Sequence, residues 1–117
     1  MKVILDTNFL VYMLEKKISV DLLFEFIGIK NAYIFLNTYA EIGKIDKKYL
    51  KILKLLIDSG KLKMIKKQGK VDELIVSEVR KNPKKTIVCT NDKELGTRIK
   101  TLGGKVIVVS KGYFKEV

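Results

Sequence analysis

The sequence contains no histidine and no tryptophan, and it has one proline and one cysteine among 117 residues. Without histidine, no imidazole can act as a general base or bind a metal, which excludes serine–histidine and cysteine–histidine catalysis and the usual zinc sites. Cys89 cannot form an internal disulfide, and its apolar surroundings in TIVCT indicate a small buried residue. No apolar run is long enough to span a bilayer and no signal-peptide pattern opens the chain, so we expect a cytoplasmic protein with no membrane partner.

Acidic residues are also scarce. The chain has 13 Asp and Glu against 24 Lys and Arg, a formal net charge of +11. This balance favours a polyanionic partner, chiefly nucleic acid, although a lysine-rich surface can also serve solubility alone. With 47% hydrophobic residues and no low-complexity segment, residues 1–117 are expected to form a single globular domain.

Short β-rich runs alternate with helical patterns along the chain. Expected strands cover 2–6, 32–37, 61–67, 86–90 and 105–110, and expected helices cover 7–16, 19–29, 38–45, 46–60, 71–82 and 91–103. Strands separated by helices pair in parallel, so the pattern predicts a three-layer α/β/α sandwich with a parallel, roughly five-stranded sheet. In such folds ligands bind beyond the carboxyl ends of the strands.

Four strand-to-helix junctions each carry an acid at this predicted edge. Asp6 ends the first strand, Glu41 lies on the first turn of the helix after the second, Asp72 opens the helix after the third, and Asp92 follows TIVCT by two residues. Converging carboxylates repel one another and need a positive counterion. Oxygen ligands favour one or two Mg²⁺ or Mn²⁺ ions, which suit phosphodiester cleavage without a histidine base.

Each acid also has a simpler interpretation. Asp6, Asp72 and Asp92 lie where helices begin, and aspartate is a favoured N-cap. Glu41 is a poor cap, and caps need not share one sheet edge, so the joint pattern favours a site. Asn8, Thr90 and Asn91 are polar neighbours that are expected to orient the ligands, although helix capping explains them almost as well.

Four segments then resemble a known family. VILDTNFL, TYAEIGKI, KVDELIVSEV and TIVCTNDKELGTRIKTLGGKVIVV look like the four acidic motifs of the PIN-domain nucleases, in order and over nearly the whole chain. They are most similar to the branch that processes ribosomal RNA precursors in the small-subunit processome, and to its archaeal relatives. The resemblance implies a metal-dependent endoribonuclease that uses Asp6, Glu41, Asp72 and Asp92, with Asn8 and Thr90 in support.

Other features leave the subfamily open. Glu73 and Glu94 stand beside the third and fourth motifs, where the processing branch often has a second aspartate, and are further candidate metal ligands. TND at the fourth motif also occurs in toxin-type PIN nucleases, so an antitoxin and a ribosome-assembly protein are both candidate partners. The resemblance further implies homodimers. A non-catalytic RNA-binding scaffold with the same fold is the remaining alternative.

Lysines are expected to guide RNA towards the acids. Those on the predicted helix 46–60 and before Asp72 would contact phosphates, as would Arg98 after the fourth motif. A solvated helix face explains the helix lysines equally well. The candidate RNA-binding residues are Lys47, Lys51, Lys54, Lys70 and Arg98.

Overall fold

A computed structural model describes all residues from Met1 to Val117. The strands are β1 (Lys2–Leu5), β2 (Ala32–Phe35), β3 (Leu62–Ile65), β4 (Thr86–Cys89), β5 (Lys105–Ser110) and β6 (Tyr113–Glu116). The helices are α1 (Thr7–Glu15), α2 (Val20–Ile27), α3 (Leu36–Ile45), α4 (Lys47–Asp58), α5 (Val71–Lys81) and α6 (Lys93–Thr101), and a 3₁₀ turn covers Pro83–Lys85. None of the helices combines the length and the apolar character that crossing a membrane would require.

One sheet runs through the molecule in the order β3-β2-β1-β4-β5-β6. The first five strands pair in parallel, which confirms the predicted three-layer α/β class. The sixth strand was not predicted and pairs antiparallel with β5. Its two-residue turn, Lys111–Gly112, has positive φ at both positions, as a tight hairpin requires. The sequence carries this signal weakly, because Asn or Asp usually precedes the glycine.

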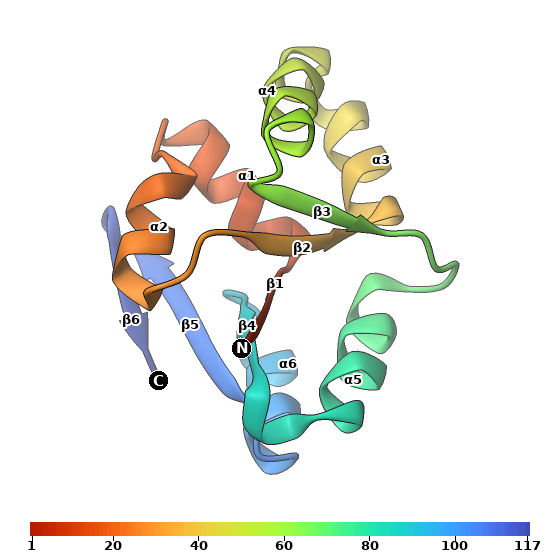
Figure 1. Ribbon diagram of the computed structural model, residues 1–117, viewed down its shortest axis with the longest axis vertical. Helices are drawn as coiled ribbons and strands as arrows, with labels where there is room; N and C mark the ends of the chain where they lie inside the picture. Colours follow the sequence, from red (N-terminus) through yellow and green to blue (C-terminus); the bar gives the residue numbers. More distant parts are fainter.

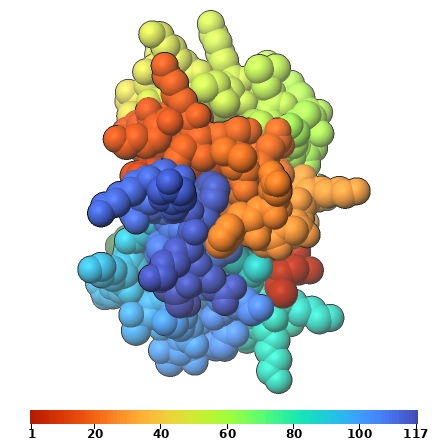
Figure 2. Space-filling view, turned by 90° about the vertical axis from the view of Figure 1, so that its left-hand side faces the viewer, coloured from red at the N-terminus to blue at the C-terminus, as the bar shows by residue number.

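The strands alternate between two cores because successive side chains point to opposite faces. On β1, Val3 and Leu5 pack with apolar residues of α1 to α4, whereas Ile4 packs with those of α5 and α6. Four helices therefore cover one face and two cover the other (Figure 1). Figure 2 shows the C-terminal hairpin lying against α2, where the rings of Phe26 and Phe114 are 5.8 Å apart.

The boundary difference that bears on the site concerns α3. It begins at Leu36, directly after β2, rather than at Asn37 or Thr38 as predicted. Its N-cap, Phe35, offers no side-chain hydrogen bond, so the sequence contains no capping residue that would mark this start. As a result Glu41 is the sixth residue of the helix and lies on its second turn, not its first.

The chain builds β2 and β3 on one side of β1 and then returns to place β4 on the other. This reversal between β1 and β4 is the switch point at which open α/β sheets bind ligands. Asp6 follows β1, and Thr90 and Asp92 follow β4, so the topology puts these residues at the switch point.

Candidate functional site

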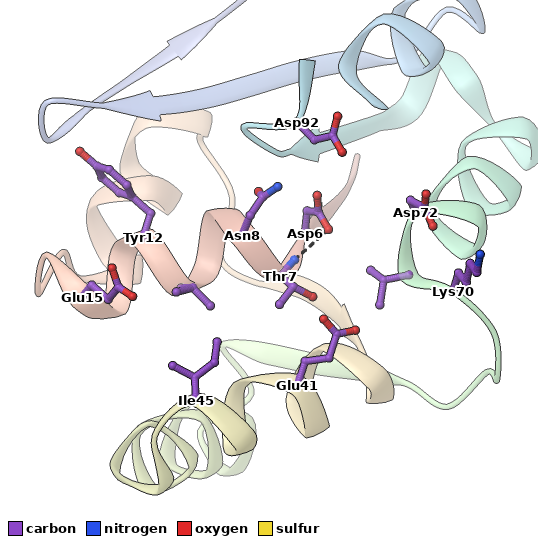
Figure 3. A pocket seen from close by; sticks show the side chains of 12 residues that line it. Asp6, Thr7, Asn8, Tyr12, Glu15, Glu41, Ile45, Lys70, Asp72 and Asp92 are labelled. Atoms are coloured by element: carbon purple, nitrogen blue, oxygen red, sulfur yellow. Dashed lines mark hydrogen bonds between the residues drawn. The ribbon is translucent and has the colours of Figure 1, made fainter. Parts of the chain in front are cut away.

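An open cleft of about 680 Å³ lies at this switch point, and twelve residues line it. All four carboxylates predicted from the strand-to-helix junctions are among them: Asp6, Glu41, Asp72 and Asp92. Figure 3 shows these side chains around the cleft, carried by four different segments of the chain. The structure therefore brings together residues that are up to 86 positions apart, from Asp6 to Asp92.

Asp6 is the most buried of the four acids, with 8% of its surface exposed. Its Oδ1 accepts a hydrogen bond of 2.9 Å from the backbone N–H of Thr7, and its Oδ2 accepts one of 2.6 Å from the hydroxyl of Thr90. Burial raises the pKa of this carboxyl, and the negative charges of Asp92 and Asp72 raise it further, while the two hydrogen bonds act in the opposite direction. The neighbouring carboxylates thus add to the effect of burial in disfavouring the ionised form of Asp6.

Thr90 joins two of the acids. Its hydroxyl donates to Asp6 and also accepts a 3.1 Å hydrogen bond from the backbone N–H of Asp92. Asp92 in turn caps α6, because its Oδ1 accepts from the backbone N–H of Leu95 at 3.0 Å. The capping interpretation is therefore correct for Asp92, and the same side chain also lines the cleft.

The two asparagines join α1 to the sheet. Asn8 Oδ1 accepts a hydrogen bond from the backbone N–H of Asn91 at 3.2 Å, and Asn91 Oδ1 accepts one from the backbone N–H of Val109 at 2.9 Å. These bonds fix the loop between β4 and α6 from both sides. Asn8 itself lines the cleft, whereas Asn91 does not.

Asp72 and Glu41 are exposed at the cleft. The sequence prediction placed Asp72 at the start of its helix, but α5 begins at Val71 with Lys70 as the N-cap residue. Asp72 is the second helical residue, and its Oδ1 accepts from the backbone N–H of Glu73 at 2.9 Å. Glu41 has no hydrogen-bond or ion-pair partner. Both retain carboxylate oxygens that are free to bind a ligand.

Several predicted residues do not line the cleft. Glu73 instead forms a two-point pair with Arg98, with N–O distances of 3.0 and 3.2 Å, and this pair lowers the pKa of Glu73. Arg98 is thus paired with an acid of α5. Glu94 and the three α4 lysines, Lys47, Lys51 and Lys54, are exposed and also lie outside the cleft. Of the predicted RNA-binding residues only Lys70 lines it.

Residues that the sequence did not single out complete the cleft. Tyr12 and Glu15 join Asn8 and Val11 on its α1 side, and the spacing 8, 11, 12 and 15 is that of one helix face. Helical spacing would have predicted that Val11, Tyr12 and Glu15 share a face with Asn8, but it does not show that this face lines a site.

A second unpredicted feature is a pair of hydrogen bonds that joins the segments around the cleft. The hydroxyls of Thr7 and the fully buried Thr38 lie 2.9 Å apart and link the start of α1 to α3. Asn37 likewise donates a side-chain hydrogen bond to the carbonyl of Gly69, which holds the loop before α5 against α3. These contacts join the segments that carry Asp6, Glu41 and Asp72.

The donor types suit a hard divalent cation, since they are carboxylate oxygens with no histidine or cysteine among them. No group of three or more potential ligands lies close enough together in this structure to hold an ion. Glu41 and Asp72 are exposed and free to change rotamer, whereas Asp6 is held by hydrogen bonds. The residues therefore fit a metal chemically, and side-chain movement would be needed to close them on it.

Comparisons with known proteins agree with this arrangement. No protein-family model matches the chain, and no curated protein matches it significantly. Among solved structures, the chain is similar to that of the PIN domain endonuclease Utp24, with a TM-score of 0.79 and 27% sequence identity over 98% of this chain and 90% of that one. Together with the parallel sheet and the acidic cleft at its switch point, this match shows that the chain has the PIN-domain fold and resembles the PIN-domain nucleases.

Proposed function

We propose that the protein is a divalent-metal-dependent endoribonuclease that cleaves RNA in the cleft lined by Asp6, Glu41, Asp72 and Asp92. The observation that carries the proposal is the convergence of these four carboxylates on one cleft of a protein with net charge +11. The chain has few acids, yet four of them and Glu15 line this one cleft. Each negative charge there disfavours the ionised form of the others. Binding of Mg²⁺ or Mn²⁺ would offset this repulsion.

The roles of the residues follow from their surroundings. Asp6 and Asp92 would hold the metal in a fixed position, because Thr90 joins one to the other. Glu41 and Asp72, which are exposed, would complete the ligand set when substrate enters. One or two bound ions would supply positive charge to the phosphate oxygens and acidify a water. Lys70, beside Asp72 at the cleft, would bind a neighbouring phosphate.

The biological setting is also part of the proposal. The sequence segments resemble the branch of the family that processes ribosomal RNA precursors, and the structural similarity to Utp24 supports that branch over a toxin. A ribosomal RNA precursor would then be the substrate, and ribosome-assembly proteins would be the partners.

The test is cleavage of end-labelled single-stranded RNA with Mg²⁺ or Mn²⁺, and with EDTA. Asp6→Asn and Asp92→Asn keep side chains that can cap a helix but lose the charge of a ligand. We expect cleavage to require metal and to fall by a factor on the order of 10² or more in either variant. Asp58→Asn, at an exposed acid at the end of α4 that lines no part of the cleft, is the matched control and should cleave normally.

Each outcome separates the alternatives. Normal cleavage by Asp6→Asn would mean that the carboxylate only caps a helix, and the metal site would be wrong. Absence of cleavage in the wild-type protein, with salt-sensitive RNA binding intact, would favour the non-catalytic scaffold.

A further inference from the structure

A second cluster of charges lies away from the cleft, around a buried acid on α5. Glu78 is 5% exposed and receives three lysine ammonium groups: Lys67 at 2.8 Å, Lys81 at 3.3 Å and Lys2 at 3.4 Å. Lys2 Nζ also lies 4.7 Å from the centre of the Tyr33 ring, and Lys63 Nζ lies 6.0 Å from it. We call this set the lysine cluster: Lys2, Lys63, Lys67 and Lys81, arranged around Glu78 and Tyr33.

The lysine cluster has more positive charge than its own structure requires. One lysine would neutralise Glu78, yet four surround it and Tyr33, so the arrangement keeps a surplus of three positive charges. Burial disfavours the charged form of Glu78, but hydrogen bonds from Lys67 and Lys81 and the charge of Lys2 outweigh it and lower the pKa to about 2. The carboxylate is therefore ionised at neutral pH and holds three ammonium groups in place.

A surplus of this kind does not stabilise the fold. Like charges close together repel one another, so the lysines beyond the first add repulsion. The lysine side chains around Glu78 remain 37% to 57% exposed, so their outer surfaces are open to a ligand. Fixed cations beside a partly exposed aromatic ring form a binding site for single-stranded nucleic acid. The cations contact its phosphates, and the ring stacks on one base.

The cluster is connected to the cleft. Lys67 belongs to the loop between β3 and α5, and three residues later Lys70 lines the cleft. Asp72 and Glu78 lie on the same helix, six residues or about 9 Å apart along its axis. Figure 1 shows this loop leading from the end of β3 into the start of α5. A strand that leaves the cleft past Lys70 would reach the lysine cluster along the same loop.

We propose that the lysine cluster is a second RNA-binding site, which holds the phosphates of single-stranded RNA as it leaves the cleft. The identity of the ligand as RNA rests on the proposed function. The site itself requires no metal and no cleavage, so the two proposals can fail separately.

The experiment measures RNA binding in EDTA, which prevents cleavage. Fluorescence anisotropy follows uridine oligonucleotides of about four and about twenty nucleotides, the shorter one within the size of a single site, across a series of salt concentrations. The test variant, Lys63→Gln/Lys81→Gln, leaves Lys2 and Lys67 paired with Glu78. The control variant, Lys17→Gln/Lys115→Gln, removes the same charge at two exposed lysines that pair with no acid and line no part of the cleft.

We expect the test variant to flatten the salt dependence for the long oligonucleotide by about 1.4 units of log K per log salt, which corresponds to two lost phosphate contacts. The control variant should bind either oligonucleotide with the salt dependence of the wild type. Equal salt dependence in the test and control variants would overturn the second site, even if the wild-type protein cleaves RNA. If cleavage is absent but the test variant behaves as expected, the second site stands and the proposed nuclease activity fails. Circular dichroism checks that both variants are folded.

Discussion

The hydroxyl of Thr90 lies 2.6 Å from Oδ2 of Asp6, and both side chains are buried at the point where β1 and β4 end. The two residues are 84 positions apart in the chain. Their contact fixes the orientation of the least accessible acid of the cleft. It also joins Asp6 to Asp92, since the same hydroxyl accepts from the backbone N–H of Asp92.

We predict that Thr90→Val destabilises the protein by about 1–3 kcal/mol, because a buried carboxylate and a backbone N–H lose their partner while the shape of the side chain is kept. Thr90→Ser keeps the hydroxyl and should recover most of this loss. Urea unfolding at neutral pH measures both variants. Equal stability of the two variants would show that the hydroxyl does not support Asp6.

Much of this cleft could be predicted from the sequence because acids at strand ends are local signals. A strand that stops at Asp6 or two residues before Asp92 places its carboxylate at a known edge of a parallel sheet. The side chains that hold these acids in place could not be predicted in this way. Thr7 and Thr38 form their contact across 31 positions, and no periodic pattern or short motif specifies that pairing.

The ion pairs between charged side chains could not be predicted from the sequence either. Arg98 was expected to contact RNA and Glu73 was a candidate metal ligand, yet they bind each other across 25 positions. Sequence spacing places both near the fourth and third motifs but does not show which way either side chain points. Similarly, Glu78 is one acid in a helix rich in charge, and its burial among lysines from three elements depends on tertiary packing.

The Glu73–Arg98 pair predicts different effects of substitution at the neighbouring acids Asp72 and Glu73. Glu73→Gln should change stability by less than about 1 kcal/mol, because 59% of the Glu73 side chain and 39% of the Arg98 side chain are exposed to solvent. It should also leave RNA cleavage close to wild type, whereas Asp72→Asn should impair it strongly. Cleavage assays of the two variants, run together, decide between them. Loss of activity in Glu73→Gln would make Glu73 a ligand after all.

Gly104 and Gly96 differ in the space that is available for an added methyl group. At Gly104 an added Cβ would lie 2.8 Å from Cγ2 of Ile99 and 3.1 Å from Cγ1 of Val79, both on β-branched side chains that cannot easily move. We therefore expect Gly104→Ala to cost about 1–3 kcal/mol.

At Gly96, inside α6, the nearest atom is 3.5 Å away on Val106, which is an ordinary contact. Gly96→Ala should therefore stabilise the protein by up to about 1 kcal/mol, since alanine favours the helix. Thermal or urea unfolding of the two variants measures the contrast. A loss of stability in Gly96→Ala would mean that α6 packs more tightly on β5 than these distances indicate.

The lowered pKa of Glu78 predicts how stability depends on pH. The carboxyl titrates near 4.5 when unfolded and at about 2 when folded, so the unfolded chain binds its proton first as the pH falls. The stabilisation is therefore complete above about pH 4.5 and is lost as the pH falls towards 2. The shift corresponds to roughly 3 kcal/mol at most, and because the lysine partners are partly exposed we expect about 1–2 kcal/mol.

Comparison with Glu78→Gln isolates this contribution from those of the other acids. The variant should be less stable than the wild type at pH 7, and the difference between the two should shrink as the pH falls from about 4.5 to 2, measured by urea unfolding at each pH. Asp21→Asn is the control, because Asp21 forms an exposed ion pair with Lys61 and should give a much smaller difference. A constant difference between wild type and Glu78→Gln across this range would show that the lysines do not hold Glu78 in its ionised form.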